Sequence, residues 1–106
     1  MTLPATPYRK TVLARIKRDP KFARALYAEA INALLDGETA EGLSMLRDLA
    51  HAQITFKELA RQTGFDDKAL HRMLSGRGNP TLRSLTAVMR VIREDLGFRP
   101  RVTVAA

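Results

Sequence analysis

The chain has 106 residues, of which 45% are hydrophobic, and its 18 Lys and Arg against 11 Asp and Glu give a formal net charge of +7 at pH 7. This length supports one domain with a single core and excludes a second catalytic domain. Cys is absent, which excludes disulfides and thiol chemistry and fits a reducing compartment.

Charge is unevenly distributed along the chain. Residues 1–24 carry seven Lys or Arg and one Asp, whereas residues 25–50 carry one Arg and five acidic residues. Residues 51–83 are basic again, with six cations and three acids. Such a surface suits nucleic acid or an acidic partner, and ordinary solvated surface charge stays open as the alternative.

Start and stop signals predict an all-α fold of about six helices with short connections. Apolar residues recur at helical spacing in each segment, which indicates one shared core. The expected starts are Thr6 with Pro7, Asp19 with Pro20, Thr39, Thr55, Asp66, and Pro80 with Thr81, and the expected stops include Gly37, Gly64, Gly76 and Gly97.

The C-terminal segment departs from this helical pattern. Val102 and Val104 alternate with polar residues at the period of a strand. A lone strand has no partner in water, so either two copies pair here across a dimer axis or the segment is a frayed tail. We therefore expect a single domain over residues 1–106, with an N-terminal helical extension (1–50), a core (51–97) and a tail or dimer strand (98–106).

The stretch FKELARQTGFDDKALHRMLSGRGNP, residues 56–80, is typical of a helix, a tight turn and a second helix. Thr55 and Glu58 have the spacing of a capping box, in which each side chain satisfies the backbone N–H of the other residue. Gly64 supplies the positive φ of the turn. Two helices joined in this way form a helix-turn-helix unit, whose second helix lies in the DNA major groove.

The residues that follow strengthen this interpretation. In FKELARQTGFDDKALHRMLSGRGNPTLRSL, the Leu-Ala pair, the Gly four residues after that Ala, the apolar residue six beyond the Gly and the Gly-and-Pro loop resemble the Xre/Cro-type helix-turn-helix family. With the upstream helices, residues 8–96 resemble its addiction-module antidote branch, the HigA-like antitoxins and their orphan regulator relatives. The resemblance implies a lambda-repressor-like fold and an autorepressor with a possible toxin partner.

The second helix of this unit has a polar face. At 100° per residue, Asp67, Lys68, His71, Arg72 and Ser75 gather opposite the apolar side chains. Lys68 and Arg72 are the best candidates for reading base edges, because a guanidinium engages guanine O6 and N7 together. His71 belongs to the same face, and Asp67 either accepts from cytosine N4 or only stabilises the helix start.

Other residues are expected to hold the DNA backbone. Amides, hydroxyls and cations beside a recognition helix grip phosphates and set its register. The resemblance places Lys57, Arg77, Asn79 and Arg83 at such positions, and Thr55 and Ser75 are expected to contact phosphates as well.

Asp66 and Asp67 stand at the start of a helix that is expected to contact the negatively charged DNA. Proteins of the family more often have Ser or Pro at this point. Lys68 and Arg72 repel each other at i and i+4 by about 0.2–0.5 kcal/mol. Asp66 as a cap contributes about 0.5–2 kcal/mol, and Asp67 about 0.3–1 kcal/mol against the helix dipole. The acids therefore offset the repulsion and let the helix form without DNA.

One recognition helix reads few base pairs, so we expect a homodimer on a palindromic operator, with its two reading helices about 34–36 Å apart. We expect the chain to be a sequence-specific DNA-binding transcriptional regulator. The alternative is a protein-interaction module with little DNA binding, which uses the basic first helix or the acidic residues 29–48. An antitoxin would combine both, with residues 1–50 on a toxin and residues 55–83 on an operator.

Other classes of protein fit less well. His51 and His71 are twenty residues apart without any Cys, so no metal site is expected, and no spacing supports a nucleophile or a phosphate loop. We expect no enzyme and no cofactor. The chain lacks an apolar run of the roughly 20 residues that a membrane span needs, and residues 1–7 lack the apolar core of a signal peptide, so a cytoplasmic protein is expected.

Overall fold

The computed structural model describes residues 5–105, with side chains from Arg9 onward. All regular structure in this range is helical, which confirms the predicted all-α fold of six α-helices. One short π-helix adds to them. The elements are α1 (Ala5–Arg18), α2 (Pro20–Leu35), α3 (Thr39–Leu49), the π-helix η1 (Ala50–Ile54), α4 (Phe56–Thr63), α5 (Asp67–Met73) and α6 (Leu82–Leu96).

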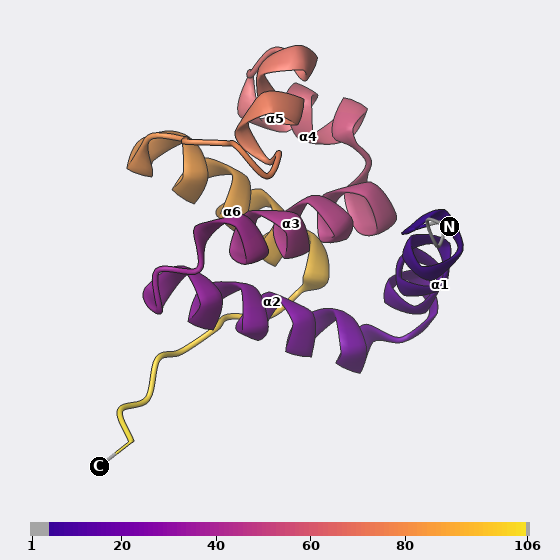
Figure 1. Ribbon diagram of the computed structural model, residues 1–106, viewed down its shortest axis with the longest axis vertical. Helices are drawn as coiled ribbons and strands as arrows, with labels where there is room; N and C mark the ends of the chain where they lie inside the picture. The colour runs from indigo at the N-terminus through magenta and orange to yellow at the C-terminus, as the bar shows by residue number, and fades with distance from the viewer. Residues whose placement is uncertain (1–4, 106) are drawn as a thin grey trace.

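Helix α3 runs through the middle of the molecule, with α2 below it, α1 at one side and the α4–α5 pair above (Figure 1). Leu43, Leu46 and Leu49 of α3 are fully buried. They belong to one hydrophobic cluster that includes residues from Ile16 of α1 to Leu96 of α6. The N-terminal helices therefore share their core with the helix-turn-helix region.

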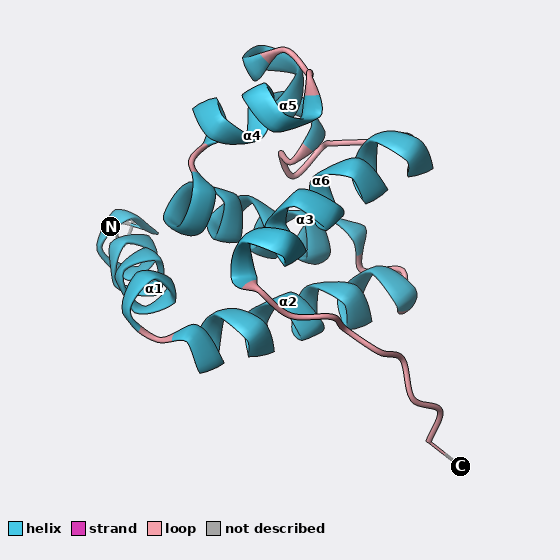
Figure 2. Cartoon of the chain, turned by 180° about the vertical axis from the view of Figure 1, so that it is seen from behind, coloured by secondary structure: helices cyan, strands magenta, loops and turns pink. Residues whose placement is uncertain are grey.

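Tyr27 joins α2 to the C-terminal part of the chain. Its hydroxyl donates to the Met89 carbonyl oxygen of α6 at 3.0 Å, and its ring meets the edge of Phe98 with centroids 5.3 Å apart. The chain leaves α6 at Gly97 (φ +72°) and then crosses α2 (Figure 2). Phe98 thus anchors the start of the tail.

Most predicted helix boundaries agree with the structure. Helix α5 ends at Met73, before the stop expected at Gly76, and two further boundaries differ. Helix α1 begins at Ala5, so the expected start at Thr6 lies within its first turn. The other difference follows α3, which continues without a break into η1. No Gly or Pro interrupts residues 43–54, and Ala50, Ala52 and Ile54 are buried, so helical backbone continues up to the capping residue Thr55.

Residues 98–105 carry no regular structure. The strand expected around Val102 and Val104 is therefore not formed within the described chain, and its pairing between two copies stays a prediction. Across residues 5–105, no helix combines the length and the apolar character that crossing a lipid bilayer requires.

Candidate nucleic-acid interface

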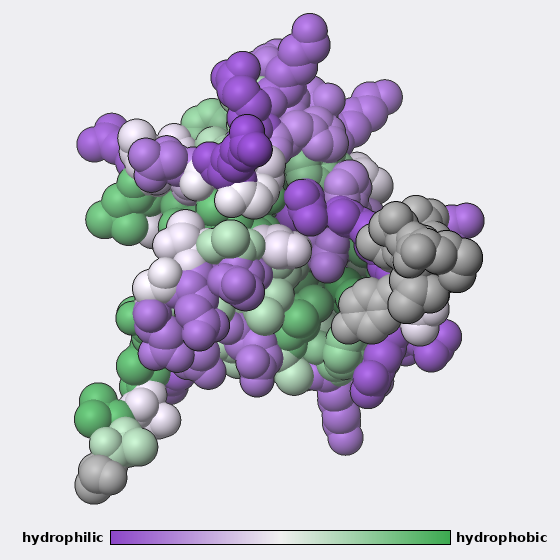
Figure 3. All heavy atoms as spheres, viewed as in Figure 1, coloured by the Kyte–Doolittle hydropathy of each residue, from purple (hydrophilic) through white to green (hydrophobic). Residues whose placement is uncertain are grey.

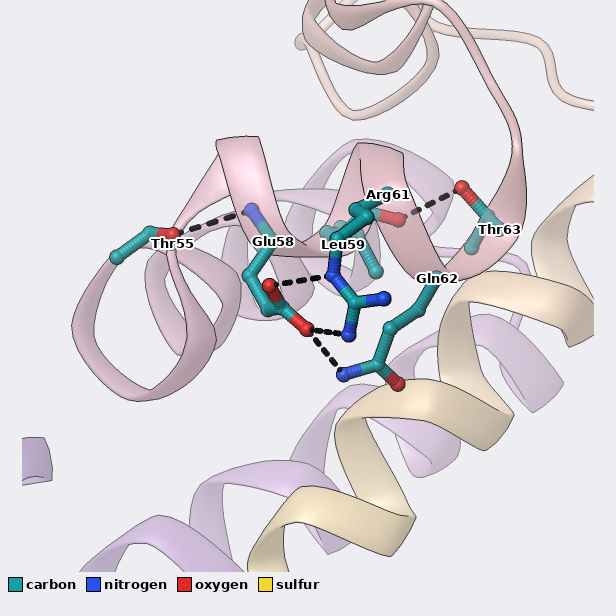
Figure 4. Close-up of polar contacts among 6 residues, drawn as sticks. All are labelled: Thr55, Glu58, Leu59, Arg61, Gln62 and Thr63. Carbon is teal, nitrogen blue, oxygen red and sulfur yellow. Dashed lines mark hydrogen bonds and ion pairs between the residues drawn. The ribbon is translucent and has the colours of Figure 1, made fainter.

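The turn between α4 and α5 is closed by local hydrogen bonds. Gly64 has φ +78°, the left-handed conformation expected of it, and its N–H donates to the Ala60 carbonyl oxygen at 2.8 Å. The Thr63 hydroxyl donates to the Leu59 carbonyl oxygen at 2.8 Å (Figure 4). It also accepts from Phe65 N at 3.3 Å. Leu59 and Leu70 are fully buried, so both helices are held to the core.

Only half of the predicted capping box forms. The Thr55 hydroxyl accepts from the Glu58 N–H at 3.2 Å, but Thr55 N donates to the Ala50 carbonyl oxygen at 2.6 Å instead of to Glu58. The Glu58 carboxylate accepts from Arg61 Nε at 2.9 Å and from Gln62 Nε2 at 2.8 Å (Figure 4). These hydrogen bonds, from Arg61 first and then Gln62, lower the pKa of Glu58 to about 2.

The start of α4 is strained. Thr55 has φ 75° and ψ 149°, a backbone region that residues other than Gly rarely adopt. The strain is held in place by two contacts, the 2.6 Å bond from its N–H into η1 and its cap on α4. Its hydroxyl oxygen accepts the cap bond, which leaves the O–H for an outside acceptor such as a phosphate.

The acidic start of α5 works differently from the expectation. Asp66 occupies the N-cap position, but its side chain accepts no capping hydrogen bond. Its contribution therefore comes from its charge near the helix N-terminus, about 0.3–1 kcal/mol, and not from a cap. Asp67 lies in the first turn, with Oδ2 at 3.7 Å from His71 Nε2.

The polar face of α5 is open to solvent at Asp67, Lys68 and Arg72, while Leu70 is buried beneath it. His71 departs from the expectation for a base reader. Although it is exposed on one side, its ring stacks on Phe56 of α4, with centroids 4.1 Å apart and planes at 18°. His71 therefore packs against α4 and does not extend freely from the reading face.

Phe56 contacts two histidine rings, and the three rings form a cluster that sequence reasoning missed. His51 of η1 stacks on Phe56 with centroids 4.3 Å apart, and the two imidazoles are 6.0 Å apart. Burial, followed by the positive charge of Arg9 and by His71, lowers the pKa of His51. The cluster depends on the π-helical backbone and the positive φ at Thr55, neither of which leaves a periodic signal in the sequence.

A groove of about 460 Å³ lies between α5 and the loop that follows it. It brings together four predicted DNA-contacting residues, namely Arg72, Ser75, Arg77 and Asn79. Ser75 donates its hydroxyl to the Arg72 carbonyl oxygen at 2.8 Å, so its proton is already engaged.

Gly78 holds the loop against α5. A Cβ at this position would collide with the Met73 carbonyl oxygen, and the Gly78 N–H donates to the Ser75 carbonyl oxygen at 2.9 Å. The absent side chain allows the loop backbone to lie directly on the end of α5. This close approach places Arg77 and Asn79 beside Arg72.

Three predicted phosphate contacts lie outside this groove, the capping residue Thr55 at the start of α4 and two cations. Lys57 is exposed in the first turn of α4. Arg83 is exposed near the start of α6 and lines a second groove of about 500 Å³, beside Tyr27 of α2. They extend the basic surface to both sides of α5 without contributing to the groove itself.

The cations around α5 share one property. Among the described residues, five exposed cations of this region have no acidic partner within ion-pair distance, whereas Arg61 on α4 is paired with Glu58. The five are Lys57, Lys68, Arg72, Arg77 and Arg83. Hydrophilic residues cover much of the α4–α5 end of the molecule in Figure 3. This end is therefore a basic surface whose charge is available to an anion.

Comparison with known proteins adds no assignment. No protein-family model, curated protein or solved structure matches the chain. The family resemblance therefore stays a prediction, and the case for function depends on the residues of the site.

Proposed function

We propose that the chain is a sequence-specific DNA-binding regulator that acts in the cytoplasm as a homodimer, with α5 in the major groove. The observation that carries this proposal is the groove in which Arg72 lies beside Arg77 and Asn79, on a helix whose neighbouring cations lack acidic partners. A base-reading guanidinium next to backbone-holding groups is the arrangement that direct readout requires.

The proposed roles follow from position. Arg72 and Lys68 contact base edges, and Arg77, Asn79, Lys57, Arg83 and the Thr55 hydroxyl contact phosphates. Asp67 stabilises the start of α5. His71 orients α5 through Phe56 and its 3.7 Å approach to Asp67, with a smaller part in readout.

Autorepression in the manner of an antitoxin is the form of regulation that we propose. A small dimer bound across its own promoter blocks polymerase by its bulk. A toxin partner would bind the N-terminal helices, which lie away from the α4–α5 end of the molecule (Figure 1).

Binding of the wild-type protein to the DNA upstream of its own gene tests the proposal. Affinity should exceed that for random duplex of equal length, and log K should fall linearly with log salt, by about 0.9 per phosphate neutralised. The measurement is fluorescence anisotropy over a salt series. Equal affinity for both duplexes would remove sequence-specific readout, and no binding to either would leave a protein-interaction module.

A further inference from the structure

Four large apolar side chains are exposed among the described residues, and they lie on neighbouring segments. Leu35 ends α2 and is 69% exposed, Leu82 begins α6 and is 76% exposed, and Val102 and Val104 of the tail are 74% and 91% exposed. The end of α2, the start of α6 and the tail occupy the same side of the molecule in both ribbon views (Figures 1 and 2). Figure 3 shows hydrophobic residues along this side. We call these four residues the apolar edge.

A groove of about 290 Å³ joins two parts of the apolar edge. Leu35 and Ile31 of α2 form one wall, and Pro100 and Val102 of the tail form the other. The tail is held at its base by the contact of Phe98 with Tyr27. Beyond that anchor, residues 101–105 are exposed and carry no regular structure, so their backbone groups have no ladder partner in one copy.

The charges around the apolar edge are of both signs. Asp36 and Glu38 lie within three residues after Leu35 and are exposed, whereas Arg101, also exposed, directly precedes Val102. A partner protein whose contacting surface carried charge of only one sign would be repelled by the residues of the same sign on this surface. A second copy related by a two-fold axis presents acid to base and base to acid, because an isologous interface pairs one patch with itself.

We propose that two copies of the chain associate through the apolar edge, around a two-fold axis that runs along this side of the molecule. In that arrangement the tails of the two copies cover each other and the exposed ends of α2 and α6. The orientation rests on the proposed function, because it is chosen to keep both α5 helices at the same end of the dimer. The tail leaves the molecule away from α5 (Figure 1), so tail pairing does not obstruct the DNA surface.

Molar mass in solution without DNA tests the interface. Sedimentation equilibrium of the wild-type chain should give a dimer. The double variant Val102→Asp with Val104→Asp, and separately Leu82→Asp, should raise the dissociation constant by at least about tenfold, because a carboxylate in an apolar contact lacks a partner. Ala14→Asp is the matched control, since Ala14 is exposed on α1 at the other side of the molecule.

The outcomes separate this inference from the proposed function. A wild-type chain that stays monomeric at every concentration, or a loss of dimer that is equal in the Ala14→Asp control, overturns the interface. A dimer that is lost only in the edge variants supports it, provided that circular dichroism shows unchanged helix content. If the wild-type dimer binds no duplex, the interface stands and the DNA-binding function falls. If the wild-type chain is a monomer that binds a single operator half-site, the DNA-binding function stands and the interface falls.

Discussion

On α4, Glu58 binds two neighbouring polar side chains, whereas on α5 the exposed cations Lys68 and Arg72 have no acidic partner among the described residues. Glu58 holds both Arg61 and Gln62, and the cation of Arg61 is thereby neutralised on the helix that carries it. Arg72 on α5 has no acidic partner among the described residues. Both helices carry an Arg, so the number of cations alone does not separate a binding helix from a supporting one. The position of the acidic side chains relative to the Arg distinguishes the two helices.

The largest expected effect comes from displacing the loop that follows α5. Gly78→Ala forces a Cβ into the Met73 carbonyl oxygen, and overpacking of this kind costs about 1–3 kcal/mol. The loop should shift away from α5 and carry Arg77 and Asn79 with it. Urea unfolding and DNA titration should both show the loss.

Gly76→Ala is the control for this loop. A Cβ at Gly76 meets no atom within 4 Å, so the free energy of unfolding should stay within about 0.5 kcal/mol of the wild type. Equal losses for the two variants would mean that Gly78 matters for chain flexibility and not for close approach.

Arg72→Ala tests directly whether the unpaired Arg of α5 reads bases. Loss of a bidentate base contact should cost about 1–3 kcal/mol on the cognate site and relax selectivity at one base position. The matched variant Arg61→Ala removes the same side chain from α4, where Glu58 already neutralises it. Anisotropy titrations with cognate and random duplex should show a large, selective loss for Arg72→Ala and little change for Arg61→Ala. A similar loss on both duplexes would make Arg72 a phosphate contact.

Glu58→Gln should make α4 resemble α5. The variant removes the carboxylate charge that holds Arg61, so Arg61 becomes available to a phosphate. The salt dependence of DNA binding should then steepen by about one phosphate, a change of about 0.9 in the slope of log K against log salt. Glu58→Gln combined with Arg61→Ala should return the slope to that of the wild type. An unchanged slope in the single variant would place Arg61 out of reach of the duplex.

Local rules were sufficient for the helices and for the turn, and insufficient where distant residues meet. Asp19, Thr81 and Gly64 act as predicted because a cap or a positive φ is decided within three or four residues. The capping box failed at Glu58 because Arg61 and Gln62 compete for its carboxylate from the next turn. The contact of His71 with Phe56 requires the backbone path through η1, which helical periodicity does not describe. The face that α5 presents was predictable, whereas the side chains that brace it were not.

The smallest expected effect concerns the stack that joins the two helices to η1. Because burial and Arg9 lower the pKa of His51 below its ordinary value of 6.5, the unfolded chain binds a proton at this residue more readily than the folded chain does. The contribution of His51 to stability is therefore fully present above pH 6.5 and is lost as the pH falls through its folded pKa. His51→Phe keeps an aromatic ring on Phe56 without a titrating group, so its free energy of unfolding should fall less than that of the wild type between about pH 7 and 5.

Asp48 does not obscure this measurement. Arg9 Nη2 lies 3.1 Å from Asp48 Oδ1, yet burial is the larger influence and raises the pKa of Asp48 above its ordinary value of 3.8. The folded chain therefore takes up that proton first, and this contribution to stability increases as the pH falls, opposite in sign to that of His51. Urea unfolding at closely spaced pH values separates the two slopes. If wild type and His51→Phe give parallel curves between about pH 7 and 5, the environment of His51 is no different in the folded and unfolded chains.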